Sequence, residues 1–557
     1  MMHQTANPPK PSKSEDLKEA DPTLAGTIAS TLSDPGLDRF SADDTYFLKF
    51  HGIYQQDDRD RRKFAKEFMF MVRCRIPGGV LTPDQYLACD DLATRYGNAT
   101  LRVTSRQGLQ FHGVVKNGLG TLVKSIDQAL LTTLAACGDV CRNVMSPAAP
   151  PQDALGIEVR ADARAVADAV APRTTAYHSI WVEGVPLKLN VDSDSPPVDP
   201  LYGTTYLPRK FKLAFAIPPR NDTDVLTNCC GFIAIANRSG ALSGYVLTAG
   251  GGMGRSHANA ATFPRLADAI GFLPRERVVE VAKGMIEMHR DFGDRANRKH
   301  ARLKYVLADH GPVWFRSELE QRIGFPLTPA PPFAFTATGD PLDWHVQTDG
   351  RWFLGLFVET GRIRDVDGAR LKTALREVVA RYRPEIRLTP GQNVVLAGIE
   401  PALKDRIGEC FAAHGIEIGR QGTEIQRGSM ACPALPTCGL AVAESERFLP
   451  TLVRRIEDAL RELGVSGQEI LIRMTGCPNG CARPYTAEIG FVGRSLGLYE
   501  IWLGGNDAGT RLNRLYQDDV RDTDIVETLR PLLARYAAER AVGERFGDWC
   551  ARSVWVH

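Results

Sequence analysis

The chain has 557 residues, 43% of them hydrophobic, so it is long enough to form several domains with buried cores. Lys and Arg total 68 against 66 Asp and Glu, and a net charge of +2 argues against a nucleic-acid-binding protein. Since no apolar run approaches the roughly 18 residues of a membrane span, we expect a protein that binds neither nucleic acid nor membranes.

The chain begins with a polar stretch, residues 1–43, which is rich in Pro, Ser, Asp and Lys. It contains no apolar core of an export signal. From this composition we expect a disordered N-terminal segment and a soluble, cytoplasmic protein.

Two segments, residues 101–114 and 386–399, match at a fixed offset of 285 residues. The identical positions pair Arg102 with Arg387, Thr104 with Thr389, Gln107 with Gln392, and Gly113 with Gly398. Each copy has the pattern of a strand, a tight turn and a second strand. Helical patterns precede them at Pro83–Tyr96 and Ala369–Tyr382, and further helical periodicity covers Gly271–Tyr305 and Glu444–Leu463.

A weaker match joins residues 230–233 to 489–492 and continues to the glycine pairs 250–251 and 504–505. The chain order is then A–B–A′–B′, although chance similarity of two hairpins remains an alternative for this second match. We expect an α/β fold with mixed sheets and a pseudo-two-fold axis. Pro-rich boundaries fall at 147–151 and 326–333, and a third lies within 402–423.

Two cysteine pairs stand out late in the chain, Cys432 with Cys438 and Cys477 with Cys481. Both lie in Pro- or Gly-rich turns, where the backbone can direct two sulfurs to one point. Four thiolates suit a cubane iron–sulfur cluster, and zinc is the alternative. The other eight cysteines are interpreted as small buried residues: Cys74, Cys89, Cys137, Cys141, Cys229, Cys230, Cys410 and Cys550.

Cations spaced two apart mark two predicted strands. Alternation places Arg73 with Arg75 on one face, and Lys210 with Lys212 on another. A solvated strand face is the ordinary explanation for either pair. Together with Arg142, Arg102 and Arg106, however, they favour a pocket for an oxyanion or carboxylate.

Two glycine runs, 250–254 and 504–505, follow apolar strands but match neither a dinucleotide-binding nor a phosphate-loop motif. Glycine there permits a sharp turn or close approach to a large flat ligand. His112 faces the same side as Gln110 in its strand and is a candidate for the pocket wall.

These motifs together resemble the sulfite/nitrite reductase haemoproteins over roughly residues 45–548. The stretches that carry the resemblance are residues 49–60, 73–79, 104–107, 207–212, 430–433 and 475–481. The resemblance implies a three-domain, pseudo-symmetric fold. Its first domain would pair two ferredoxin-like half-domains, 44–147 and 330–402; residues 148–329 would bind sirohaem and substrate, and 403–557 the [4Fe–4S] cluster and sirohaem.

By the same resemblance, Cys432, Cys438, Cys477 and Cys481 hold the cluster, and Cys481 also bridges to the sirohaem iron. Arg102 and Arg106 match arginines that meet the sirohaem carboxylates. The substrate-binding cations would be Arg73, Arg142, Lys210 and Lys212.

The resemblance is strongest to the assimilatory sulfite reductase branch, which implies six-electron reduction of sulfite to sulfide in sulfur assimilation. Nitrite reduction to ammonia on the same cofactors is the nearest alternative, and a non-catalytic iron–sulfur or zinc interaction protein is another. Since the chain has no flavin or nicotinamide motif, an external donor is required: ferredoxin, or a flavoprotein that oxidises NADPH.

Overall fold

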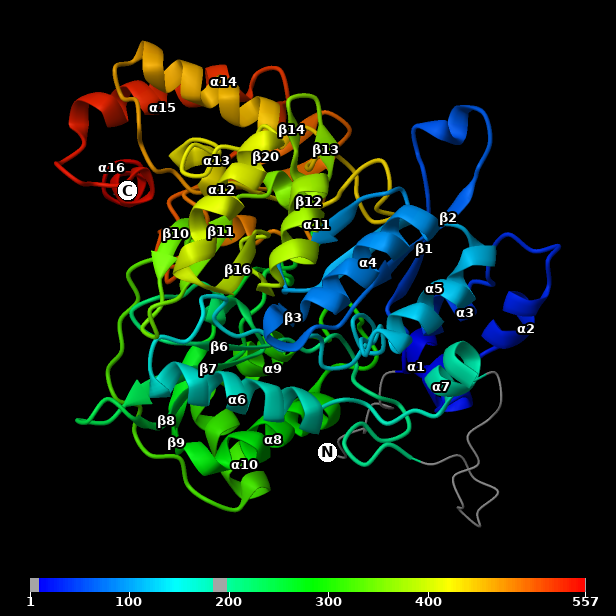
Figure 1. Cartoon of the computed structure of the whole chain (residues 1–557). Helices are drawn as coiled ribbons and strands as arrows, with labels where there is room; N and C mark the ends of the chain where they lie inside the picture. Colours follow the sequence, from blue (N-terminus) through cyan, green and yellow to red (C-terminus); the bar gives the residue numbers. More distant parts are fainter. Residues whose placement is uncertain (1–9, 184–197, 556–557) are drawn as a thin grey trace.

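The computed structural model describes residues 10–183 and 198–555, and it arranges them as two related halves (Figure 1). Each half contributes one sheet with covering helices to a half-domain pair and one sheet to a second layer. The A–B–A′–B′ order expected from the repeats is therefore present in space. The mixed α/β fold class is confirmed.

The two half-domains are five-stranded sheets that exchange an edge strand. The first has the order β1 (Ile53–Asp57), β2 (Phe68–Arg73), β5 (Leu109–Val114), β4 (Leu101–Val103) and β12 (Arg362–Ile363). The second has the order β10 (Asp343–Val346), β11 (Trp352–Leu356), β16 (Val394–Ile399), β15 (Glu385–Leu388) and β3 (Val80–Leu81). Because β12 pairs with β4 and β3 pairs with β15, each half-domain completes the other's sheet.

Helices α4 (Pro83–Tyr96) and α5 (Lys116–Gln128) belong to the first half-domain, and α11 (Leu371–Tyr382) and α12 (Lys404–Ala413) to the second. The first predicted helix matches α4 at both ends, and Thr82 and Gln85 form a capping box at its start. The first sequence repeat is structural: Gln107 and Gln392 both have positive φ, 54° and 75°. Thr104 and Thr389 close these two turns identically, accepting from Gly108 N and Asn393 N.

Four strands of the B and B′ sheets share one topology, and B′ has a further parallel strand at its edge. The first runs β6 (Leu213–Ala216), β7 (Cys230–Ala236), β8 (Leu242–Ala249) and β9 (Asp268–Pro274). The second runs β17 (Met430–Ala431), β18 (Ile472–Thr475), β19 (Ile489–Ser495), β20 (Leu498–Leu503) and β21 (Arg514–Arg521). In both, a parallel pair is followed by an antiparallel meander.

The glycine pairs confirm that the second repeat is not chance similarity. Gly250 and Gly504 both take positive φ, 84° and 95°, directly after β8 and β20. At the next position, a Cβ on Gly251 or Gly505 would lie 2.2 or 2.3 Å from a backbone oxygen. Both copies therefore need glycine for a sharp turn against packed backbone.

The helices around these sheets are α6 (Ala154–Ala169), α8 (Val278–Phe292), α9 (Leu303–His310) and α10 (Pro312–Ile323) for B, and α14 (Leu449–Glu462), α15 (Ile525–Glu539) and α16 (Phe546–Ser553) for B′. The prediction of helical periodicity over Gly271–Tyr305 is confirmed for α8 and for the start of α9. It is wrong at its start, where β9 extends to Pro274, and over residues 293–302, which separate the two helices. A short apolar strand and the start of an amphipathic helix both contribute buried apolar residues, so the pattern did not separate them.

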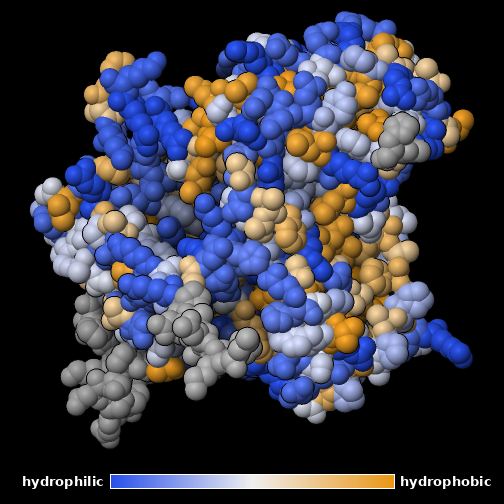
Figure 2. All heavy atoms as spheres, turned by 180° about the vertical axis from the view of Figure 1, so that it is seen from behind, coloured by the Kyte–Doolittle hydropathy of each residue, from blue (hydrophilic) through white to orange (hydrophobic). Residues whose placement is uncertain are grey.

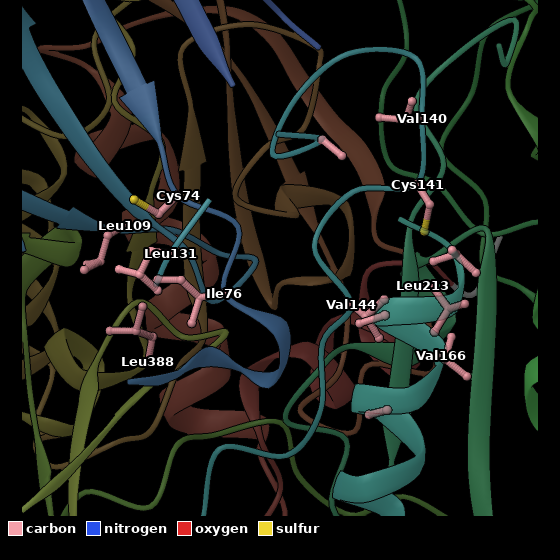
Figure 3. Close-up of a cluster of buried hydrophobic side chains, with 14 of the residues drawn as sticks. Cys74, Ile76, Leu109, Leu131, Val140, Cys141, Val144, Val166, Leu213 and Leu388 are labelled. Carbon is pink, nitrogen blue, oxygen red and sulfur yellow. The ribbon is translucent and has the colours of Figure 1, made fainter. Parts of the chain in front are cut away.

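The main hydrophobic core joins both half-domains to the B sheet. Leu388 of β15 lies beside Ile76 and Leu131, with Cys74 close by (Figure 3). Cys141 lies near Leu213 in the other part of this view. The eight cysteines predicted to be buried outside the two pairs are all buried in the structure.

The N-terminal prediction is wrong for residues 10–43; residues 1–9 lie outside the described part. Helices α1 (Lys13–Ala20) and α2 (Ile28–Ser33) form there. Lys18 is fully buried and its Nζ donates to Glu15 Oε1 at 2.7 Å and to Leu207 O at 2.8 Å. The polar composition was misleading because these charges pair with each other and with distant backbone.

Hydrophilic side chains cover much of the face shown in Figure 2, with apolar ones scattered between them. Within the described ranges, none of the helices has both the length and the apolar character that crossing a bilayer demands.

Candidate active site

The two cysteine-bearing loops leave neighbouring parallel strands at the same end. Cys432 directly follows β17, and Cys477 lies two residues after β18. The strands pair in register, with Ala431 opposite Met474. Gly476 N then donates to Cys432 Sγ at 3.4 Å, so parallel pairing brings residues 44 apart in the chain to one place.

The four thiols form one electrostatic group. Burial, followed by the nearby Cys481 and Cys477, raises the pKa of Cys432 well above its ordinary value. Burial and Cys481 likewise raise the pKa of Cys477 to about 12, and burial raises that of Cys438. As thiolates they would repel one another, so a bound cationic centre is what would hold all four deprotonated.

Two distant segments fix these loops. The Arg59 guanidinium donates through Nη1 to Ala441 O at 2.5 Å and through Nη2 to Gly439 O at 2.7 Å. The backbone N–H of Arg59 also donates to Pro436 O. On the other side, Arg255 N donates to Pro478 O at 2.9 Å. The glycine run 250–254 thus reaches the second cysteine loop, which the sequence did not indicate.

Cys481 differs from its partners because it is exposed, while Cys432 and Cys477 are buried. It forms part of a recess with a volume of about 110 Å³. The wall consists of Arg73, Cys74, Thr104, Ser105, Arg106, Gly108, Ala136, Arg142, Asn143, Lys210, Lys212 and Cys481. The structure therefore brings all four predicted substrate cations, Arg106 and Cys481 to one place.

Three separate elements carry the four cations. Arg73 is the last residue of β2, and Lys210 and Lys212 directly precede β6. Arg142 N donates to Phe211 O at 2.9 Å, so the segment that carries Arg142 runs beside the lysine-bearing one. Phe211 and Leu213 are fully buried, and this alternation turns both lysines to the recess, as the sequence predicts.

The positive charges of the recess are not neutralised by acids. Arg73 Nη1 contacts Cys137 Sγ at 3.1 Å, and Arg142 Nε donates to Gly138 O at 2.8 Å. Across the described ranges, neither these arginines nor the two lysines form an ion pair with a carboxylate. Burial, then the neighbouring Arg209 and Arg302, lower the pKa of Lys210 to about 7.

The pKa of Lys212 is lowered as well. Burial, then Arg106 and Lys210, lower its pKa well below the ordinary value. Cations that cost free energy to hold together in this way are expected where an anion binds between them.

The arginines predicted to meet sirohaem carboxylates lie in different surroundings. Arg106 is in the recess, where Nη1 donates to Asn228 Oδ1 at 2.7 Å and the buried Nε has no hydrogen-bond partner. Arg102 is not among the lining residues: its Nε donates to Glu446 Oε2 at 2.9 Å and its Nη2 to Ala431 O at 2.8 Å. Its role toward a cofactor stays a prediction.

Arg75 does not share the recess with Arg73. Strand β2 ends at Arg73, so alternation no longer applies two residues later. The Arg75 guanidinium instead donates to Ala167 O at 2.7 Å. His112 is also absent from the lining and is buried beside Gln110.

Sequence reasoning missed several supporting residues. With its amide oxygen toward Arg73, Gln110 accepts from Nε at 3.1 Å and from Nη2 at 2.6 Å. Asn143 donates to Ile76 O and Arg106 O, and its own Oδ1 stays buried without a partner in the recess wall. Gln110 had one available signal, since it alternates with His112 in a strand beside Arg73.

The residues fit the cofactors that the resemblance implied. The donor set is four thiols, which are soft ligands suited to an iron–sulfur centre. Cys481 also faces the recess, whose cations have no carboxylate partner among the described residues. The recess wall contains buried polar atoms without hydrogen-bond partners, which suits a site for an anionic ligand.

Known proteins share this architecture. The protein-family model described as "Nitrite/Sulfite reductase ferredoxin-like half domain" matches residues 64–129 and 345–410. The model described as "Nitrite and sulphite reductase 4Fe-4S domain" matches residues 162–327, the B copy, whereas the four cysteines lie in B′.

Two curated relatives match over almost their whole length. The "Sulfite reductase [NADPH] hemoprotein beta-component" of Myxococcus xanthus is 47% identical, over 100% of this chain and 98% of that protein. The protein of the same name from Geobacillus kaustophilus is 45% identical, over 98% and 96%. The solved structure of Mycobacterium tuberculosis NirA has the same fold, with a TM-score of 0.77, 24% identity, and coverage of 98% and 97%.

The fold and the thiol-and-cation recess define an iron–sulfur oxidoreductase. The chain belongs to the nitrite and sulphite reductase family. Membership implies a sirohaem and a [4Fe–4S] cluster as its cofactors, and it rules against the zinc and non-catalytic alternatives.

Proposed function

We propose that this chain is the haemoprotein of an assimilatory sulfite reductase and reduces sulfite to sulfide. The observation that carries the proposal is the recess in which four unpaired cations face the exposed thiol Cys481. The relatives at 45–47% identity are named sulfite reductase hemoprotein components, which supports the same assignment.

In this proposal Cys432, Cys438, Cys477 and Cys481 would hold the cluster, and Cys481 would also hold the sirohaem. When bound, these cofactors would supply electrons one at a time; six electrons and six protons convert SO₃²⁻ to S²⁻ and three molecules of water. Of the four thiols, Cys481 is the one placed in the recess wall, so it suits the shared position.

The four cations would bind and orient the oxyanion. Each charge-assisted hydrogen bond to a sulfite oxygen contributes about 1.5–3 kcal/mol in a partly desolvated site. Lys210, whose pKa lies near 7, can also deliver a proton at neutral pH to an oxygen that leaves as water. Arg73 and Arg142 would stabilise the negative charge that develops on oxygen.

Arg106 and Arg102 would meet the sirohaem carboxylates. Arg106 has a buried Nε free for this. Arg102 can take the role only if a carboxylate competes with Glu446, to which Arg362 also donates. Arg106→Gln should therefore reduce sirohaem retention more than Arg102→Gln does.

For the electron donor we propose a flavoprotein partner that oxidises NADPH, because the full-length relatives are named as NADPH enzymes. Several stretches of the sequence, such as 137–143 and 250–255, instead resemble ferredoxin-dependent members of the family. Reduced ferredoxin and an NADPH-reduced flavoprotein, each supplied at equal concentration, would be compared as donors in sulfide production.

The proposed activity is tested with purified holoprotein and a chemical one-electron donor. Sirohaem absorbance, iron and acid-labile sulfide content, and sulfide formed from sulfite are measured together. A protein that contains both cofactors and forms no sulfide would contradict the proposal. Nitrite is the second substrate to test, and a higher kcat/KM for nitrite than for sulfite would reverse the substrate assignment.

A further inference from the structure

A second group of metal-binding side chains lies on α11 and α12, outside the recess. Cys410 and His414 are four residues apart at the end of α12, and Glu377 projects from α11. The potential ligand atoms of these three residues all lie within 4.8 Å of one another. In the part of the chain that the structure describes, this is the one cluster of three such groups at that separation.

Helix geometry accounts for the arrangement. Residues at i and i+4 share one face of a helix, so Cys410 and His414 point the same way. Helices α11 and α12 pack against each other (Figure 1) and place Glu377 opposite that face. His414 Nε2 contacts Glu377 Oε2 at 2.9 Å, and Cys410 Sγ lies within 4.8 Å of the potential ligand atoms of both residues.

The three side chains differ in exposure in a way that suits an ion reached from solvent. The Cys410 side chain is buried and the His414 side chain is 10% exposed, whereas that of Glu377 is 47% exposed. His414 Nδ1 is buried without a hydrogen-bond partner. A small turn of the imidazole toward an ion would therefore break no second hydrogen bond of the ring.

The structure assigns Glu377, Cys410 and His414 as a binding site for a divalent transition metal of the zinc class. A thiolate, an imidazole and a carboxylate are all zinc ligands, and the thiolate selects against Mg²⁺ and Ca²⁺. Tetrahedral zinc with bonds of about 2.0–2.3 Å needs only a modest closure of the present ligand separations. Water would fill the fourth position.

Such an ion would join α11 to α12 and so tie together the helical layer of the second half-domain. The positive charge of the Arg381 guanidinium favours the ionised forms of both Glu377 and Cys410. It would have to remain on the solvent side of the carboxylate when an ion binds. The site shares no residue with the cysteine cluster or the cation recess, so it does not depend on the proposed activity.

Equilibrium dialysis of the holoprotein against Zn²⁺, with total metal counted, tests the assignment. We expect one zinc per chain, with iron content and sirohaem absorbance unchanged, and no comparable uptake of Mg²⁺. We expect Glu377→Gln, which alters an exposed side chain, to weaken zinc binding, and His414→Gln to do so as well. Loss of a residue that only supports a metal ligand weakens binding by about 10–100-fold, so loss of a ligand itself should weaken it by at least this much. Cys410→Ser should do the same.

Glu409→Gln and His345→Gln are the matched controls, because Glu409 is exposed on the same helix and His345 belongs to the same half-domain. Both should retain wild-type zinc binding. Zinc at a concentration that saturates the wild type should also raise its melting temperature by more than that of Glu377→Gln. Wild-type protein that retains no zinc, or variants that bind it as tightly as the wild type, would overturn the assignment.

Discussion

Ser105 and Cys481 are 376 residues apart in the chain, yet Ser105 Oγ donates a hydrogen bond of 3.0 Å to Cys481 O. Ser105 lies in the tight turn of the first repeat, and both residues line the recess. This contact ties the loop of the shared cysteine to the sheet that carries Arg73. It links the place where electrons would arrive to the place where the substrate would bind.

Ser105→Ala should test that link. A neutral hydrogen bond contributes about 1 kcal/mol, so we expect sulfide production to fall by about 5-fold, with both cofactors retained. Ser33→Ala, which removes an exposed hydroxyl bonded to Ser30 O, is the control. Unchanged turnover in Ser105→Ala would show that the contact does not position Cys481.

Cys481→Ser should separate the two cofactors. The oxygen ligand is harder than thiolate and holds iron less well in a soft-ligand site. We expect the magnetic coupling between cluster and sirohaem, followed by EPR and Mössbauer spectroscopy, to be lost. A variant that still shows the coupled spectrum would point to another bridging ligand.

Lys212→Met should lower activity and stabilise the cofactor-free protein. Loss of one charge-assisted contact predicts a fall in sulfide production of about 10- to 100-fold. The pKa of Lys212 is lower in the folded chain than in the unfolded chain, so the unfolded chain binds more protons between those two values. The lysine therefore destabilises the fold most below its folded pKa, and the penalty shrinks as pH rises toward 10.5.

Thermal unfolding of the cofactor-free protein at pH 6 should consequently show a higher melting temperature for Lys212→Met than for the wild type. Lys124→Met, at an exposed position on α5, is the control and should change neither stability nor activity. A lower melting temperature in Lys212→Met would show that the lysine charge is compensated in the empty recess.

Sulfite binding should weaken as pH rises through about 7, because Lys210 loses its charge there in the empty recess. An oxyanion stabilises the charged lysine, so binding near this pH should take up a proton. Calorimetric titrations in buffers of different ionisation enthalpy measure that proton. Sulfite itself exchanges a proton in this pH range, so the wild type is compared with Lys210→Arg, in which the ligand's contribution is the same. Lys210→Arg should lack the additional uptake, and equal proton exchange in the two proteins would exclude Lys210 as the linked group.

Asp224→Asn should destabilise the contact between the two halves. Asp224 Oδ2 accepts from Arg473 Nη1 at 2.8 Å and from Arg483 Nε, and all three side chains are buried. Arg483 also donates to Ser105 O and Pro390 O, one oxygen from each tight turn. Removing one partner of a buried pair costs about 3–5 kcal/mol.

Urea unfolding followed by sirohaem absorbance would measure this loss. Asp518→Asn, which breaks a more exposed pair with Arg494, should cost less than about 1 kcal/mol. Equal unfolding midpoints for the two variants would mean that Asp224 is not central to the interface.

Local patterns in the sequence determined much of the site. Alternation placed Lys210 and Lys212 on one face, because their apolar neighbours must be buried. The sequence repeat also predicted that its two turns have the same conformation, and Gln107 and Gln392 both adopt the left-handed backbone conformation. The cysteine spacing indicated the donor set because two residues in one short turn cannot lie far apart.

Only the tertiary structure decided what meets across long sequence separations. No periodic pattern in the sequence indicates the exchange of β3 and β12 between the half-domains. The same is true of the contact of Arg59 with the first cysteine loop and of the hydrogen bond from Arg102 to Glu446. The order in the N-terminal helices likewise rests on partners such as Leu207 that lie far along the chain. Hydrophobic periodicity records which face of a segment is buried, but not which other segment buries it.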